Sequence, residues 1–187
     1  MNPIIIAILY GLSGFLMKLS DDEYDENNDK IISSLLGIFA GLICGFLASH
    51  DTNATYIFLG ILIAALLSLK IDGIHHVVTL ITFTTTYLFF GLINLNIFIL
   101  AICVVSAFID EIGNDKEYIY KRSRFFKVFF DYRFTMKIAI FSLSVLGLVN
   151  ILYGFEISFI GFLAPETIVY FLLFELSYET ARKISKI

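Results

Sequence analysis

The chain has 187 residues, of which 58% are apolar and 16% are charged, and its formal net charge at pH 7 is -4. Its mean hydropathy is +0.86. Soluble domains carry about 25% charged residues, so this composition excludes an ordinary soluble domain and indicates an integral membrane protein. The length allows about six or seven spans of roughly 20 residues with short connections, so we expect a single transmembrane domain over residues 1–187.

Seven apolar runs predict seven transmembrane helices, at residues 3–19, 31–49, 54–69, 77–93, 97–109, 136–152 and 157–174. Backbone polar groups in hydrocarbon must be hydrogen-bonded within their own segment, and the runs lack the alternation of a transmembrane barrel. The predicted fold class is therefore all-α, an integral membrane helical bundle of about seven transmembrane helices.

The basic residues predict the orientation of this bundle. With seven spans, all thirteen Lys and Arg residues lie on one side, in or beside the connections after the first, third and fifth spans and in the C-terminal tail. The positive-inside rule makes that side cytoplasmic, with the N-terminus outside and the C-terminus inside. We therefore expect a multi-pass protein of the cell membrane. Of the seventeen Asp and Glu residues, all except Asp51, Glu156 and Glu166 lie on the same cytoplasmic side.

An acidic motif follows the first apolar run, where Asp22, Asp25 and Asp29 form the pattern DxxDxxxD directly after Asp21. If the first span continues as a helix, this spacing places the three carboxylates on one face over about two turns. Carboxylate oxygens are ligands suited to Mg²⁺. A solvated acidic turn explains the same residues, and the motif alone does not separate the two interpretations.

A second acidic motif, Glu111 and Asp115 at ExxxD spacing, follows the fifth span on the same predicted side. Two such groups can hold Mg²⁺ bridged to a diphosphate, while Lys and Arg take the remaining phosphate charge. The candidate phosphate contacts are Lys70, Lys121, Arg122 and Arg124.

These motifs resemble those of the UbiA superfamily of intramembrane prenyltransferases, NDxxDxxxD and DxxxD. Asp21 takes the place of the Asn in the first motif, and Glu111 takes the place of the first Asp in the second. The stretch LLSLKIDGIHH is also similar to the family's YSLKLKR at the corresponding turn. The family usually has nine helices and an Arg-Pro stretch after its first motif; this chain has room for seven helices and lacks that stretch.

The resemblance implies a Mg²⁺-dependent prenyltransferase that binds a prenyl diphosphate, a lipid substrate, at a cytoplasmic site among membrane lipids. The implied metal ligands are Asp22, Asp25, Asp29, Glu111 and Asp115, and Asp21 belongs to the substrate-binding set. Two other interpretations are open: a divalent-cation transporter or channel, and a non-catalytic membrane protein with an acidic cytoplasmic surface. No motif for soluble hydrolase or nucleotide chemistry is visible, and we expect no nucleic-acid partner.

Three further features carry expectations of their own. Adjacent histidines on a helix point about 100° apart, so we do not expect His75 and His76 to bind the same metal ion. The basic and aromatic stretch at residues 120–137 is typical of an interfacial amphipathic helix. Glu166 either lies within the last span, at an insertion cost of about 2.5 to 3.5 kcal/mol, or marks a helix start after Pro165.

Overall fold

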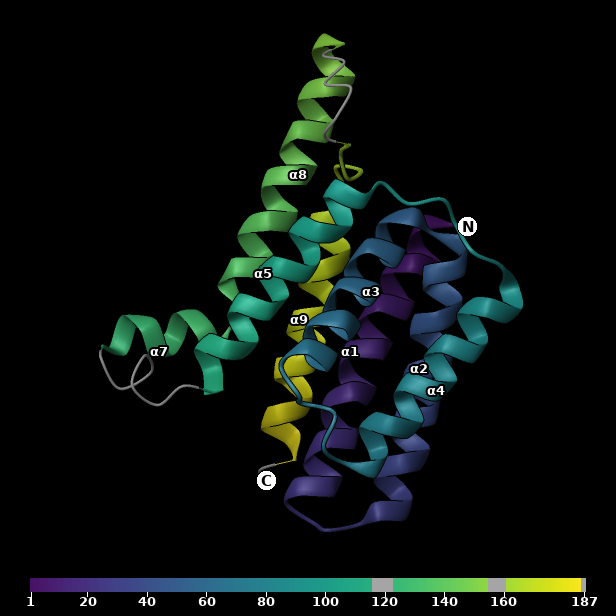
Figure 1. Cartoon of the computed structure of the whole chain (residues 1–187), viewed down its shortest axis with the longest axis vertical. Coiled ribbons are helices and arrows are strands. Elements are labelled where there is room, and N and C mark those ends of the chain that lie inside the picture. The colour runs from purple at the N-terminus through teal and green to yellow at the C-terminus, as the bar shows by residue number, and fades with distance from the viewer. Residues whose placement is uncertain (116–122, 155–160, 186–187) are drawn as a thin grey trace. The chain divides into compact units, whose positions relative to one another are not determined.

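The computed structural model describes residues 1–115, 123–154 and 161–185, and every regular element in these ranges is an α-helix (Figure 1). The predicted all-α fold class is therefore confirmed for these residues. The helices form two compact units: the first unit contains Met1–Thr55, Ile71–Ile93 and Val169–Ile187, and the second contains Tyr56–Lys70 and Asn94–Ile168.

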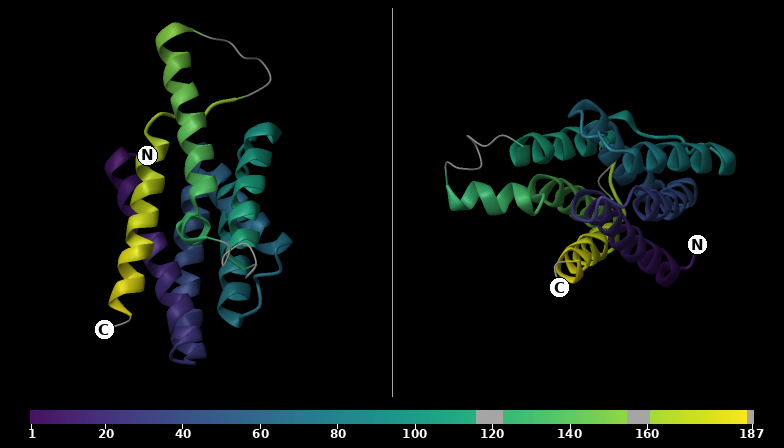
Figure 2. Two further views of the ribbon diagram at one scale, coloured as in Figure 1. Left: turned by 90° about the vertical axis from the view of Figure 1, so that its left-hand side faces the viewer. Right: turned by 90° about the horizontal axis from the view of Figure 1, so that it is seen from below.

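The first unit is built from four helices, which run alongside one another in Figures 1 and 2: α1 (Pro3–Asp25), α2 (Lys30–His50), α4 (Ile74–Phe90) and most of α9 (Thr167–Ile184). Helix α2 packs against both α1 and α4. Helix α9 packs against α1, where the rings of Tyr10 and Tyr170 stack with centroids 5.7 Å apart.

Three glycines of α2 let α4 approach its backbone closely. Gly37, Gly41 and Gly45 recur every four residues and so share one face of the helix. A Cβ on Gly41 would lie 2.7 Å from the carbonyl oxygen of Thr79, and one on Gly45 would lie 2.8 Å from that of Phe83. Small residues at such spacing permit close helix contact in membranes, and here they fix the position of α4 beside α2.

The second unit contains most of α3 (Thr52–Leu67) together with α5 (Ile97–Asp115), α7 (Arg124–Asp131) and α8 (Phe134–Tyr153). Helices α5 and α8 lie side by side (Figure 2). Asp110 of α5 joins them, because its carboxylate accepts hydrogen bonds from the backbone N–H groups of Thr135 at 3.0 Å and Met136 at 2.8 Å. These N–H groups belong to the first turn of α8, which has no helical partners for them.

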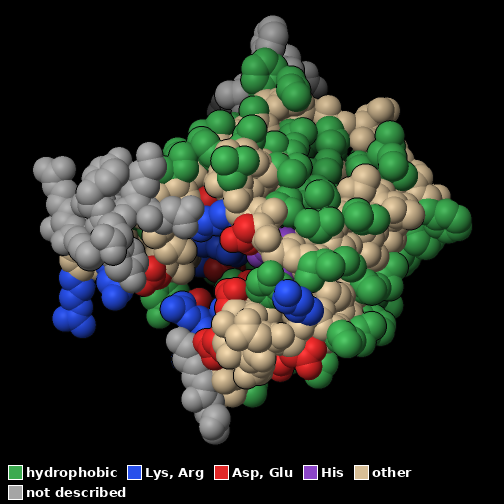
Figure 3. All heavy atoms as spheres, turned by 60° about the horizontal axis from the view of Figure 1, so that its bottom comes forward, with side chains coloured by type: hydrophobic (Ala, Val, Ile, Leu, Met, Phe, Trp, Pro, Cys, Tyr) green, Lys and Arg blue, Asp and Glu red, His purple; other side chains and the backbone are tan. Residues whose placement is uncertain are grey.

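Four of the described helices are long and apolar enough to cross a membrane: α1, α2, α8 and α5 over Ile97–Asn114. Helices α3 and α4 are apolar but shorter. Large apolar side chains are exposed on these elements, among them Ile8, Phe39 and Phe141, and hydrophobic atoms cover much of the face drawn in Figure 3. Soluble proteins rarely expose contiguous apolar surface on this scale, so the chain is a membrane-associated helical protein.

Six predicted apolar helices correspond to α1, α2, α3, α4, α5 and α8. The helix expected in the basic and aromatic stretch is also present, as α7, and its Phe130 packs on α5 at Gly113.

The predicted last helix, at residues 157–174, is wrong over residues 161–166, and its first residues, 157–160, lie outside the described residues. Helix α9 begins at Thr167 and continues to Ile184, and residues 161–166 are not helical. Pro165 stands two residues before the helix, where its fixed φ and missing N–H favour a helix start. Glu166 therefore lies exposed in the turn before α9 instead of in the middle of a helix. Of the two interpretations of Glu166, the structure favours the helix start.

Candidate functional site

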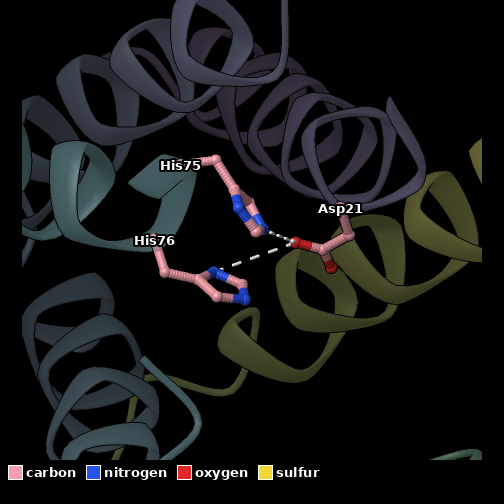
Figure 4. Close-up of side chains that lie close together, drawn as sticks. All are labelled: Asp21, His75 and His76. Atoms are coloured by element: carbon pink, nitrogen blue, oxygen red, sulfur yellow. Dashed lines mark ion pairs between the residues drawn. The ribbon is translucent and has the colours of Figure 1, made fainter. Parts of the chain in front are cut away.

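A carboxylate and two imidazoles meet in the first unit, at the C-terminal end of α1 and the first turn of α4 (Figure 4). We call Asp21, His75 and His76 the Asp21 cluster. Oδ1 of Asp21 lies 3.4 Å from Nε2 of His75 and 3.9 Å from Nδ1 of His76. One possible ligand atom from each of the three residues lies within 4.8 Å of the other two. A single ion could therefore reach all three side chains.

His75 is the enclosed member of the cluster. It is 2% exposed, and neither of its ring nitrogens has a hydrogen-bond partner among the described residues. The ring of Tyr24 stacks on it with centroids 4.3 Å apart. Gly73 also lies against the ring, where an added Cβ would come within 2.5 Å of Nδ1. The imidazole is thus held tightly by packing: Nε2 faces the Asp21 carboxylate at 3.4 Å without the geometry of a good hydrogen bond, and Nδ1 has no hydrogen-bond partner among the described residues.

Neighbouring polar groups orient the cluster. The hydroxyl of Tyr178, on α9, donates a hydrogen bond to Oδ2 of Asp21 at 3.1 Å. Nε2 of His76 lies 3.9 Å from the carboxylate of Asp72, and the His76 side chain is 36% exposed. Figure 3 shows histidine atoms at the surface of the face that it draws. Asp21 thus keeps one oxygen toward the histidines while the other is held by α9.

The three aspartates of the first acidic motif occupy three different environments. Asp22 is buried in α1, with Nζ of Lys18 2.6 Å from its Oδ1, and it also accepts a hydrogen bond from Ser185. Asp25 is the exposed last residue of α1. Asp29 caps α2 instead, because its Oδ1 accepts hydrogen bonds from the first N–H groups of that helix.

The condition for a shared face, a first helix that continues through Asp29, is therefore not met, and the turn interpretation holds for Asp29. Helix α1 ends at Asp25, and the chain turns through Asn28, which has a φ of 53°. Asn tolerates this left-handed conformation better than most residues, so it allows a short turn between two long helices. Asp29 does not share a helix face with Asp22 and Asp25.

In the second unit, Glu111 lies between two cations. Nζ of Lys70 is 2.8 Å from Oε2 of Glu111, and a terminal nitrogen of Arg133 is 3.6 Å from Oε1. We call these three residues the Glu111 cluster. The sequence predicted Glu111 as a metal ligand and Lys70 as a phosphate contact, and the fold brings the two side chains together.

The remaining predicted residues add less. Arg124 is the exposed first residue of α7, and Asp115 is the last residue of α5, although its side chain is not among those described. Lys121 and Arg122 lie outside the described residues. The two acidic motifs belong to different units, so their convergence around shared Mg²⁺ stays a prediction.

That His75 and His76 face the same carboxylate does not follow from the sequence pattern. Their ring centroids lie 3.9 Å apart, with an angle of 36° between the planes. The 100° separation of adjacent Cα–Cβ bonds does not keep the rings apart, because side-chain rotation in the first turn of α4 brings both toward Asp21. The Gly before the paired histidines was the one sequence signal, since Gly73 leaves room for the His75 ring.

No family model matches the chain, and neither a curated protein nor a solved structure matches it.

Proposed function

We propose that the chain is a UbiA-like, Mg²⁺-dependent intramembrane prenyltransferase that binds a prenyl diphosphate at its cytoplasmic side. The observation that carries this proposal is the Glu111 cluster. A diphosphate site of this kind needs carboxylates for the metal and cations for the phosphate oxygens in one place. Lys70 and Glu111 supply such a pair, 2.8 Å apart, from the end of α5 and the connection before α4.

The donors fit Mg²⁺ in chemical type. Asp25 offers an exposed carboxylate at the end of α1, and Glu111 offers one at the end of α5. When bound, Mg²⁺ neutralises phosphate oxygens and stabilises the departing diphosphate. Lys70 and Arg133 would exchange their ion pairs with Glu111 for hydrogen bonds to phosphate oxygens. The C–O bond of the prenyl diphosphate would break and release diphosphate, and the prenyl carbon would bond to an acceptor nucleophile that gives up a proton to water; the identity of the acceptor is left open.

The proposal includes the predicted topology. It assigns seven spans to α1, α2, α3, α4, α5, α8 and α9, with the N-terminus outside and the C-terminus in the cytoplasm. The ends of α1 and α5 that carry the acidic residues then face the same compartment. The segregation of Lys and Arg along the sequence supports this arrangement.

Binding of geranylgeranyl diphosphate to the purified full-length protein tests the proposal. We expect binding in the presence of Mg²⁺ and a loss of at least about tenfold in affinity, or about 1.4 kcal/mol, in Asp25→Asn. Glu26→Gln is the matched control, because Glu26 is the exposed neighbour of Asp25 and no predicted ligand. Equal binding in EDTA, or equal losses in both variants, contradicts the proposal.

The same protein in liposomes separates the transport alternative. A transporter needs polar groups within its spans, whereas Glu166 lies exposed in the turn before α9. We expect no protein-dependent flux of Mg²⁺ or Mn²⁺. A flux that Glu166→Gln abolishes would favour the transporter.

A further inference from the structure

We propose that the Asp21 cluster binds one divalent transition-metal ion of the Zn²⁺ type, a class of metal different from the Mg²⁺ of the proposed function. The inference concerns the first unit alone, and it does not depend on prenyl diphosphate binding.

The geometry is close to that of a metal site. Ligand atoms at about 2.0 to 2.1 Å from a tetrahedral ion lie about 3.3 Å from one another. Nε2 of His75 already lies 3.4 Å from Oδ1 of Asp21, and Nδ1 of His76 lies 3.9 Å from the same oxygen. Small side-chain rotations would place the three atoms around one ion.

The burial of His75, whose Nε2 is ion-paired with Asp21 but makes no hydrogen bond of good geometry, also points to a ligand. A buried polar atom without a hydrogen bond is rare in folded proteins and requires an explanation. His75 is 2% exposed, and both of its ring nitrogens lack a hydrogen-bond partner among the residues that the structure describes. A metal ion bound between Nε2 and Asp21 would satisfy the nitrogen that faces the carboxylate.

The donor set selects the class of metal. Two imidazole nitrogens and one carboxylate oxygen suit Zn²⁺, Co²⁺ or Ni²⁺, whereas Mg²⁺ prefers oxygen ligands alone. Three protein ligands leave a coordination position open for water or another ligand. The site is also reachable, because the His76 side chain is 36% exposed.

Two polar groups flank the cluster. Metal-bound histidines usually present their other ring nitrogen to a carboxylate or carbonyl. Nε2 of His76 lies 3.9 Å from the exposed carboxylate of Asp72, which is beyond hydrogen-bond distance. The Tyr178 hydroxyl holds the second oxygen of Asp21 at 3.1 Å, and this hydrogen bond would fix the orientation of that ligand.

Titration with Co²⁺ tests the proposal, using full-length protein without a histidine tag, stripped with EDTA and then freed of EDTA. We expect about one equivalent of Co²⁺ per chain, with the strong visible absorption of a low-coordinate ion, and displacement by Zn²⁺. His76→Gln should weaken binding by at least about tenfold, since loss of an outer-shell partner alone already costs that much. His76 is partly exposed, so this variant should fold even if a change at His75 does not.

The matched control is His50→Gln. His50 is the third histidine of the chain and lies on α2, with its Nδ1 2.9 Å from the carbonyl oxygen of Phe46. It should bind Co²⁺ as the unmodified protein does. Equal binding in His76→Gln and in the unmodified protein would overturn the proposal, and so would displacement of Co²⁺ by a modest excess of Mg²⁺. Because His76 is no predicted Mg²⁺ ligand, the His76→Gln variant should still bind geranylgeranyl diphosphate, which separates failure of this site from failure of the proposed function.

Discussion

Asp22 is the most enclosed carboxylate of the first acidic motif. It is 4% exposed, and its two oxygens contact Lys18 and Ser185. A buried charge keeps its place only when it is paired, so Lys18 is part of what allows a carboxylate near the end of an apolar helix. A metal ion at Asp22 would have to compete with this ammonium group.

Replacing Lys18 tests how strongly the pair is needed. Lys18→Met should lower the free energy of unfolding by roughly 3 kcal/mol, because it leaves the carboxylate of Asp22 buried without its cation. Thermal unfolding of the detergent-solubilised protein measures the effect. Lys30→Met is the control, since Lys30 is the exposed first residue of α2, and its loss should change stability by no more than about 0.5 kcal/mol.

A second variant makes the result specific to the pair. Replacing both partners, Lys18→Met with Asp22→Leu, should recover most of the lost stability, because no buried charge is left unpaired. If the double variant is as unstable as Lys18→Met, the loss comes from packing of the lysine stem and not from the ion pair.

Single residues also show how far sequence reasoning reaches. Lys70 and Glu111 were assigned to one site from charge type and from the sides of the predicted spans, and their side chains do meet. The pairing of His75 and His76 with Asp21 was missed, because it depends on how closely α4 packs on α2. The directions of side chains along one helix do not reveal how closely that helix packs on another.

At the scale of elements, the glycines of α2 decide where α4 lies. The carbonyl oxygen of His75 would lie 3.0 Å from a Cβ on Gly37. The glycines of α2 therefore also set the position of His75 along α2. Close backbone approach leaves little freedom for either helix to shift. The position of His75 relative to Asp21 is therefore a consequence of the helix contact.

Adding a side chain within the stripe should separate the two helices. Gly41→Val should destabilise the protein by about 1 to 3 kcal/mol or more, because its Cβ would lie 2.7 Å from the Thr79 carbonyl oxygen. Leu42→Val is the control: Leu42 is 41% exposed, so the same new side chain meets no packed helix there. The melting temperatures of the two variants in detergent measure the difference. A similar small change in both would show that α2 and α4 do not need close contact.

Most elements could be predicted because long apolar runs carry a strong signal. Helix α1 extends past its predicted end to Asp25, since its acidic last turns still form helical hydrogen bonds. The last helix was misplaced because apolar composition alone does not mark where a helix starts, and Pro165 carried the better signal. Composition locates apolar segments, whereas their ends depend on capping and turn residues such as Asp29 and Asn28.

At the scale of the whole molecule, one short stretch of the chain serves both polar clusters. The connection between α3 and α4 supplies Lys70 to the Glu111 cluster of the second unit. The first turn of α4, which follows it, supplies His75 and His76 to the Asp21 cluster of the first unit. Both clusters also take a carboxylate from the C-terminal end of an apolar helix, α1 or α5. The proposed function needs these carboxylates in one compartment, so it requires that the ends of α1 and α5 face the same side of the membrane.

Labelling of single cysteines tests that topology. Cys44 and Cys103 are first replaced by alanine, and one cysteine is then introduced by Asn27→Cys, in the turn after α1, or by Asn94→Cys, in the connection after α4. A membrane-impermeant maleimide should label the second variant in intact cells and the first only after permeabilisation, because the positive-inside rule places Asn27 in the cytoplasm and Asn94 outside. Permeabilised cells provide the control that both thiols can react. The reverse pattern would show that the orientation is inverted. Labelling of both variants in intact cells would show that both sites lie outside, so α2, α3 and α4 would cross the membrane an even number of times. The predicted span count would then fail, and with it the placement of the ends of α1 and α5 in one compartment.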